Sequence, residues 1–181
     1  MDEEMKSAYI IPTGDEIRGG IVLDLDAPEL IAQIVKKYPE AEVTRTCPLL
    51  DVEDTILRKI KELAEREPDL IVLIGGSGGG HRFSKTLGKD FTHSALEKFL
   101  DAYSSHEIYG KNGHMWSKLI CGKTERTTVI NVPGPFTEAK AAMEAFLQAY
   151  SEQRSVDEIS LRMAEAVYRQ YPTGAASLNE C

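Results

Sequence analysis

The sequence lacks any apolar run that could cross a membrane, and further absences narrow its class. Its longest apolar run near the middle covers residues 70–74, whereas a membrane helix needs about 20 residues. The acidic N-terminus has no basic segment followed by an apolar one, so we expect no signal peptide. Cys47, Cys121 and Cys181 are odd in number and widely spaced, which argues against a disulfide framework or a zinc pattern. These absences predict a cytoplasmic protein in a reducing compartment.

The chain also lacks an excess of basic residues. Its net charge of −8 argues against a general nucleic-acid binder, which needs a basic face. The charge is uneven, however, because residues 70–89 and 108–124 contain no acidic residue and carry several basic ones. Two such segments in an acidic chain are typical of a local anion site. Chance clustering on solvated loops would explain either segment alone.

Length and hydrophobic patterning indicate one α/β unit. The 181 residues are enough for one core and few for two. We expect a domain over residues 1–150, with the helix and tail of 151–181 packed on it or on a neighbouring subunit. Alternating apolar patterns predict strands at 8–12, 41–47, 70–74, 117–121 and 127–132, the last two as a hairpin. Helices are expected at 26–38, 51–66, 92–103, 137–150 and 155–171, and the tail after 171 is expected to be loose.

This order of elements predicts a three-layer α/β/α sandwich with a mainly parallel, mixed sheet. The hairpin suggests one antiparallel strand. The unbroken apolar run at 70–74 is typical of a strand that is covered on both faces. Ligands of such folds bind at the carboxyl ends of the strands, so the loops that follow these strands are the place to look for a site.

A glycine stretch follows the apolar run directly. Residues 75–80 are all glycine except Ser77. Glycines let backbone N–H groups approach a ligand closely, and successive N–H groups form a nest for an anion, usually a phosphate. The spacing fits neither a Walker motif nor a dinucleotide fingerprint, in which His81 would have to be glycine. A flexible turn is the alternative, but a turn needs only one or two glycines, and we therefore favour a phosphate site.

Four short segments occur in a particular order along the chain. They are Thr13-Gly14-Asp15-Glu16-Ile17, Asp51 ahead of a helix, Gly75-Gly76-Ser77-Gly78 with Lys89-Asp90-Phe91-Thr92, and Pro133-Gly134 after a strand. Over about residues 8–147 this set resembles the molybdopterin-binding family of molybdenum cofactor biosynthesis. The chain departs from the family pattern in three places: nine residues, 81–89, separate Gly80 from Asp90, Asp26 replaces a common asparagine, and Pro135-Phe136 replaces a polar residue and proline.

The resemblance implies a site for molybdopterin, a pterin with a terminal phosphate. Family members either activate it with ATP and Mg²⁺ or insert molybdate, and they are commonly trimers. The resemblance and the chemistry of phosphates suggest Asp51 and Asp90 as reactive or Mg²⁺-holding carboxylates. The expected ligand-binding residues are Thr13, Gly14, Asp15, Glu16, Gly75, Gly76, Ser77, Gly78, Gly79, Arg82, Lys85, Lys89, Thr92, Pro133 and Gly134.

Several of these residues have structural alternatives. Asp51 is a good N-cap for the helix that follows it. The negative charge of Asp90 is favourable near the N-terminus of its helix because of the helix dipole. Asp24 and Asp26 are more typical of caps for the first long helix. Trp116 could stack on a pterin ring, although such a residue more often lies in a core or a subunit contact. His93 and His106 show no pattern that indicates a role.

Three functions remain open from the sequence. The first is an enzyme that adenylates molybdopterin. The second is a carrier that binds molybdopterin or the finished cofactor without chemistry, which the long loop and altered Pro-Gly turn favour. The third is a different nucleotide-phosphate enzyme on the same fold, such as the competence-damage-inducible family. That family shares the opening Thr-Gly-Asp/Glu region, but its glycine motif is followed by paired aspartates that this chain lacks.

Overall fold

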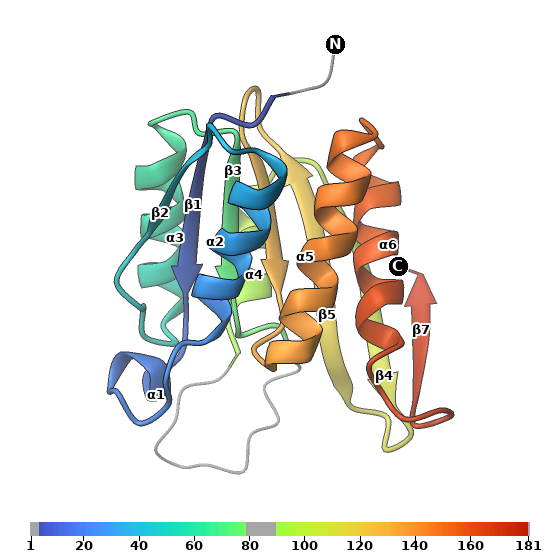
Figure 1. Cartoon of the computed structure of the whole chain (residues 1–181). Helices are drawn as coiled ribbons and strands as arrows, with labels where there is room; N and C mark the ends of the chain where they lie inside the picture. Colours follow the sequence, from blue (N-terminus) through green and yellow to red (C-terminus); the bar gives the residue numbers. More distant parts are fainter. Residues whose placement is uncertain (1–3, 79–89, 181) are drawn as a thin grey trace.

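A seven-stranded sheet forms the middle layer of the computed structural model, which describes residues 4–78 and 90–180 (Figure 1). The strands are β1 Ser7–Pro12, β2 Glu42–Arg45, β3 Leu70–Ile74, β4 Tyr103–Gly110, β5 Met115–Lys123, β6 Thr128–Val132 and β7 Ala176–Glu180. Their order across the sheet is β2-β1-β3-β6-β5-β4-β7. The predicted α/β class with a mixed sheet is therefore confirmed.

The sheet has a parallel half and an antiparallel half. Strands β2, β1, β3 and β6 pair in parallel, so their carboxyl ends lie at one edge of the sheet (Figure 1). Strand β5 is antiparallel to both β6 and β4, and β7 is antiparallel to β4. The expected hairpin of β5 and β6 is present. The expectation of one antiparallel strand was wrong, because β5 and β7 both run against the others.

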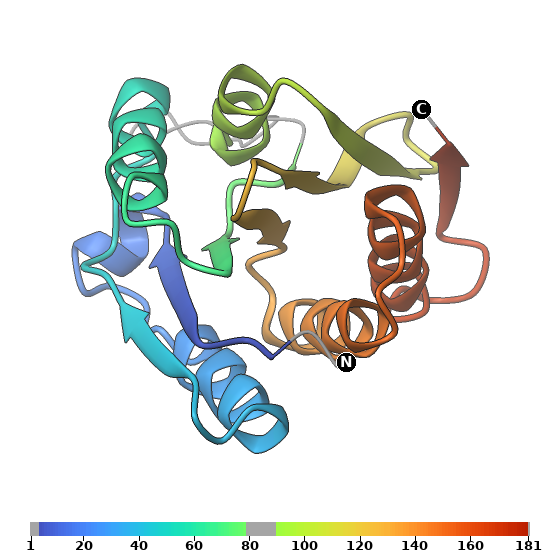
Figure 2. The same ribbon diagram turned by 90° about the horizontal axis from the view of Figure 1, so that it is seen from above.

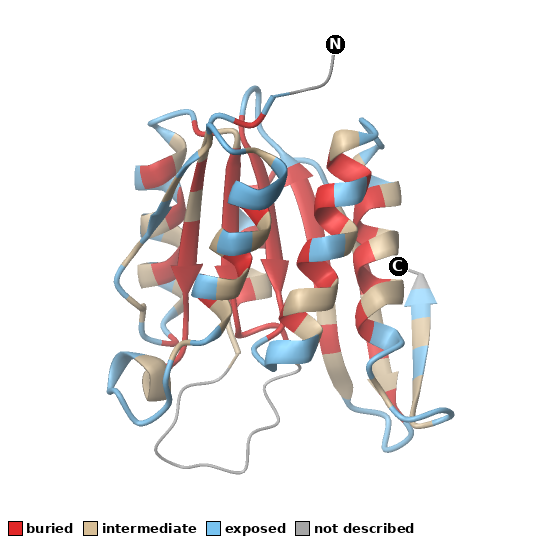
Figure 3. Cartoon of the chain, in the orientation of Figure 1, coloured by how far each residue is buried: buried red, intermediate tan, exposed pale blue. Residues whose placement is uncertain are grey.

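Helices cover both faces of this sheet. They are α1 Asp15–Arg18, α2 Asp26–Lys37, α3 Glu53–Ala64, α4 Thr92–Phe99, α5 Phe136–Ser151 and α6 Val156–Tyr168. Seen from above, α2, α5 and α6 lie on one side and α3 and α4 on the other (Figure 2). Strand β3 shows how both layers are anchored, since Leu70, Val72 and Ile74 belong to the core under α2 and α5, and Ile71 and Leu73 to the core under α3 and α4. The fully buried strand stands out in Figure 3.

Two strands were missed by the sequence prediction. The helix expected to reach Tyr103 ends at Phe99, and the chain continues into β4. Half-buried and fully buried residues alternate in its second half, where His106, Ile108 and Gly110 are buried. This polar strand is stabilised by pairing with β5 on one side and β7 on the other. The tail expected to be loose supplies β7, because its backbone groups complete the hydrogen bonds of the β4 edge.

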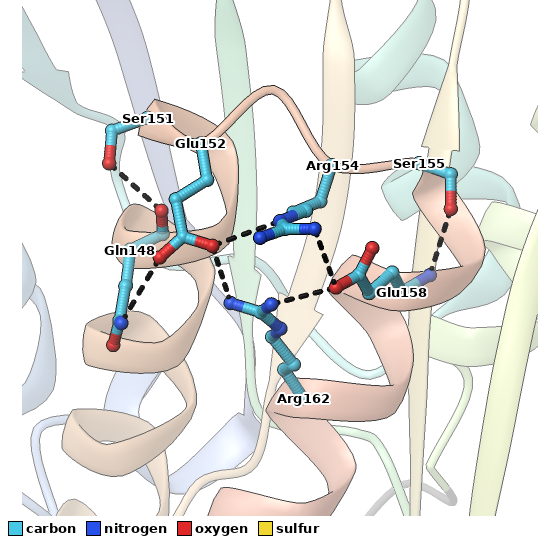
Figure 4. Close-up of polar contacts among 7 residues, drawn as sticks. All are labelled: Gln148, Ser151, Glu152, Arg154, Ser155, Glu158 and Arg162. Atoms are coloured by element: carbon cyan, nitrogen blue, oxygen red, sulfur yellow. Dashed lines mark hydrogen bonds and ion pairs between the residues drawn. The ribbon is translucent and has the colours of Figure 1, made fainter.

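The C-terminal helix α6 packs on α5 and on strands β4 and β5. It begins as expected, since the Ser155 hydroxyl accepts a hydrogen bond from the Glu158 N–H at 3.2 Å. Charged residues tie the two helices together (Figure 4): Arg162 donates to Glu152 at 2.9 Å and to Glu158 at 2.7 Å. Hydrogen bonds from Arg154, Arg162 and a glutamine lower the pKa of Glu152 to about 2. This network joins the end of α5 to the first turns of α6.

No helix in the described part of the chain is long and apolar enough to cross a membrane. The cysteines follow the sequence expectation only in part. Cys121 is buried on β5, and this burial raises its pKa to about 12. The strand expected at 41–47 would have included Cys47, but β2 ends at Arg45 and Cys47 is exposed in the loop beyond it.

Candidate functional site

A cavity of about 650 Å³ opens where β1, β3 and β6 end. Three segments that follow these strands form its floor, and they contain Thr13, Gly14, Gly75 to Gly78, and Pro133 to Pro135. Asp51, from the loop before α3, and Asp90, from the residues before α4, also line it. The parallel half of the sheet explains this convergence, because strands of one direction end at the same edge.

The glycine stretch presents part of its backbone to this cavity. Gly75 and Gly76 have φ angles of 86° and 61°, which other residues rarely adopt. The carbonyl groups of Gly76 and Ser77 turn into the protein, where they accept hydrogen bonds from the N–H groups of Thr92 and Lys118. The Gly75 N–H donates to Val132. Among residues 4–78 and 90–180, the amides of Gly76, Ser77 and Gly78 have no acceptor, so they are available to an anion.

Two buried threonines support this backbone on the side that faces the protein interior. The Thr13 hydroxyl donates to the Ile74 carbonyl at 2.7 Å and lies 3.2 Å from the Thr92 hydroxyl. A Cβ on Gly76 would clash with the Thr92 side chain. Thr92 is completely buried and does not line the cavity, so its contribution is to shape the glycine turn rather than to touch a ligand. Close packing therefore accounts for some of the glycines that the sequence assigned to a ligand.

The Ser77 hydroxyl lies 3.2 Å from the hydroxyl of Ser117 on β5, and both are buried. His93, for which the sequence showed no role, donates from Nε2 to the Gly78 carbonyl at 3.0 Å. These contacts fasten Ser77 to β5 and Gly78 to α4. A histidine in the first turn of a helix gave no sequence signal for this, because the carbonyl that it holds is 15 residues away.

The acidic residues near the cavity differ in burial and in whether they line it. Asp51 is 5% exposed, and it exchanges backbone-to-carboxylate hydrogen bonds with Asp15 at 3.0 and 3.3 Å. The N-cap position of α3 is Val52, which makes no side-chain cap bond, so Asp51 lies one residue before the expected position. Asp15 does not line the cavity, whereas its neighbour Glu16 does. Asp24 caps the first long helix, as expected, through the Ala27 N–H at 3.0 Å.

The carboxylate of Asp90 lies against Gly78. A Cβ placed on Gly78 would be 2.7 Å from Asp90 Oδ2, so the glycine leaves room for this carboxylate beside the three amides. Asp51 and Asp90 are thus two carboxylates on one cavity, the donor set that Mg²⁺ takes together with phosphate oxygens. Within the described residues there is no group of three or more His, Cys, Asp or Glu side chains that could hold a metal alone.

Gly79, Arg82, Lys85 and Lys89, four of the expected ligand-binding residues, lie outside the described residues. The structure places Trp116, the possible stacking residue, on the cavity wall, and it adds neighbours of Trp116 that were not expected to bind a ligand. On the β5 side the cavity is lined by Asn112, His114, Met115, Trp116, Glu138 and Tyr171, and near α1 by Ile17 and Val22. Tyr171 could not have been found from a motif, because it reaches the cavity only through the packing of α6.

A family model described as "Probable molybdopterin binding domain" matches residues 9–153 of the chain. No curated protein matches the sequence significantly. The fold is similar to that of MogA, with a TM-score of 0.62 and 18% identity over 88% of this chain and 100% of that one. It is similar to the molybdopterin biosynthesis enzyme MoaB from Thermus thermophilus, with a TM-score of 0.62 and 22% identity over 88% of this chain and 97% of that one.

CinA from Thermoplasma acidophilum, a protein of unknown function, has the same fold, with a TM-score of 0.56 and 19% identity over 82% of this chain and 98% of that one. At these identities the solved structures establish the fold alone. The family model establishes the family as well, since its match spans residues 9–153. This range includes every described residue that was expected to bind the ligand. The chain belongs to the molybdopterin-binding family of molybdenum cofactor biosynthesis.

Proposed function

We propose that this protein adenylates molybdopterin with ATP and Mg²⁺. The observation that carries the proposal is the placement of the amides of Gly76, Ser77 and Gly78 on the same cavity as Asp51 and Asp90. Amides of this kind bind phosphate oxygens, and two carboxylates beside them suit a divalent cation. Transfer of a nucleotidyl group to a phosphate needs both features in one place.

In the proposed reaction an oxygen of the molybdopterin phosphate attacks the α-phosphorus of ATP. The new P–O bond joins the pterin phosphate to AMP, and the bond between the α-phosphorus and pyrophosphate breaks, so pyrophosphate leaves with the electron pair. The amides of the glycine stretch would hold the phosphate in line and donate to its oxygens. A Mg²⁺ ion held by Asp51 and Asp90 would neutralise charge on the phosphates.

A carrier function is the second candidate. It is favoured by the position of Asp51, a buried residue whose carboxylate already accepts the Asp15 N–H. The hydrogen bond leaves this carboxylate fewer lone pairs to offer to a Mg²⁺ ion. Such a site would suit a protein that binds a phosphate without activating it.

A turnover assay separates the two functions. Purified protein is incubated anaerobically with molybdopterin, ATP and Mg²⁺, and pyrophosphate release and the adenylated pterin are measured. We expect both products, and their loss in Asp90→Asn with molybdopterin affinity changed by less than about 1 kcal/mol. Molybdopterin binding without either product would establish the carrier function instead.

A further inference from the structure

Three side chains from separate elements meet on the β5 side of the cavity. Trp116 lies on β5, Glu138 lies in the first turn of α5, and Tyr171 follows α6. Tyr171 lies beyond the residues that the family model matches, so this grouping is a property of this chain and not of the matched motifs. It is also separate from the glycine stretch, although both border the same cavity.

The three side chains are held in defined positions. The Tyr171 hydroxyl donates to Glu138 Oε2 at 3.1 Å. The rings of Tyr171 and Trp116 meet edge to face, with centroids 5.0 Å apart and planes at 69°. The Trp116 indole packs across Gly110 of β4, where a Cβ would clash with it. A rigid aromatic pair beside a fixed carboxylate suits the recognition of a flat polar ring.

The electrostatics of Glu138 point to a ligand that donates hydrogen bonds. Burial raises the pKa of its carboxyl, and the bond from Tyr171 offsets only part of this. No Lys, Arg or His of the described residues forms an ion pair with it. A partly desolvated carboxylate on a cavity wall is stabilised when two N–H groups bind its two oxygens.

We infer that Glu138, Tyr171 and Trp116 form the subsite for the pterin ring, with Glu138 accepting from the ring N–H and the adjacent 2-amino group. These two donors are parallel and adjacent, so they match a carboxylate in the bidentate manner of a guanidinium. The aromatic pair would contact the ring itself. The assignment rests on the proposed function in one respect, since it takes the guest of the cavity to be a pterin. Guanine has the same donor edge, whereas adenine lacks it.

Binding measurements with phosphate-free probes test the subsite. The probes are 6-hydroxymethylpterin, the lumazine analogue with a carbonyl in place of the 2-amino group, and guanosine. We expect the wild-type protein to bind the pterin at least about tenfold more tightly than the lumazine, because a hydrogen bond to a charged group contributes about 1.5–3 kcal/mol. We expect weaker binding of guanosine.

Variants then assign the effect to Glu138. Glu138→Gln should lose about tenfold in pterin affinity and should no longer distinguish pterin from lumazine, because one acceptor becomes a donor. Its affinity for inorganic pyrophosphate, which probes the glycine stretch, should not change. Tyr171→Phe should lose less, since the carboxylate remains. Glu144→Gln is the matched control, because Glu144 is an exposed residue of the same helix.

The outcomes distinguish the subsite from the proposed function. Equal affinity of Glu138→Gln and wild type for the pterin, with circular dichroism unchanged, would overturn the subsite and leave the function standing. Tighter binding of guanosine than of the pterin would assign the subsite to a guanine compound and overturn the pterin assignment. If the wild-type protein bound pyrophosphate but neither the pterin nor molybdopterin itself, the proposed function would fail as well.

Discussion

Asp15 and Asp51 hold each other through two reciprocal hydrogen bonds: the Asp51 N–H donates to Asp15 Oδ1 at 3.0 Å, and the Asp15 N–H donates to Asp51 Oδ2 at 3.3 Å. Each carboxylate is thus bound by the backbone of the other residue. This arrangement offsets part of the repulsion between neighbouring acids, since an N–H group stabilises the charged form. It joins the start of α1 to the loop before α3, at the border of the cavity.

Asp51→Asn separates the charge of this residue from its hydrogen bond. The amide oxygen can still accept the Asp15 N–H, so we expect little change in melting temperature. Adenylation should fall by about 100-fold, because a carboxylate that holds a metal at a reacting phosphate contributes several kcal/mol. Steady-state kinetics measures this, with Asp54→Asn, an exposed residue of α3, as the matched control. Full activity of Asp51→Asn would remove its charge from the mechanism.

Gly78→Ala should weaken the binding of phosphate groups. Its Cβ would lie 2.7 Å from Asp90 Oδ2 and 3.5 Å from the Trp116 carbonyl oxygen, so the loop and the carboxylate must move apart. We expect a loss of about tenfold in pyrophosphate affinity by calorimetry, equal to about 1.4 kcal/mol. Gly134→Ala should lose less, because its Cβ would meet Gly75 Cα at an ordinary 3.8 Å. The reverse order would contradict the geometry of the glycine stretch.

The buried strand β3 should carry much of the stability. Leu73→Ala removes a fully buried side chain from the core under α3 and α4, and we expect a cost of about 2–5 kcal/mol in urea unfolding. Val35→Ala provides the comparison. The helical spacing places Val35 with the apolar residues of its helix, but it is 40% exposed, so the change should stay within about 0.5 kcal/mol. Similar costs for the two variants would contradict the packing described above.

Asp26 should make stability fall as pH rises between about 4 and 6. Burial, and next the charge of Asp24, raises the pKa of Asp26 from 3.8 to about 6. In this interval the folded protein retains a proton that the unfolded chain has released, so each rise in pH favours unfolding. Asp26→Asn should reduce this trend and raise stability modestly at pH 7, since solvent screens a half-exposed group. Unfolding curves at pH 4, 5, 6 and 7 measure it, and the same slope in both proteins would exclude Asp26 as its source.

The parallel half of the molecule could be predicted from local patterns, because burial on both faces requires a continuous apolar run and an amphipathic helix requires a stripe. Leu70 to Ile74 and the helix at Glu53–Ala64 are examples. The polar strand β4 and the strand β7 could not be predicted in this way. Their residues are stabilised by hydrogen bonds to strands distant in the sequence, and such pairing leaves only a weak local signal.

The sequence by itself determined the family, the glycine stretch after the central strand and the acids at positions 51 and 90, because backbone freedom and charge are properties of single residues in a short motif. Only the tertiary structure decided that Thr92 supports the glycines from below, that Asp15 binds Asp51, and that Trp116, Glu138 and Tyr171 share one wall. These contacts join residues that are 16 to 79 positions apart. Such proximity arises from the packing of helices on the sheet, which short motifs do not encode.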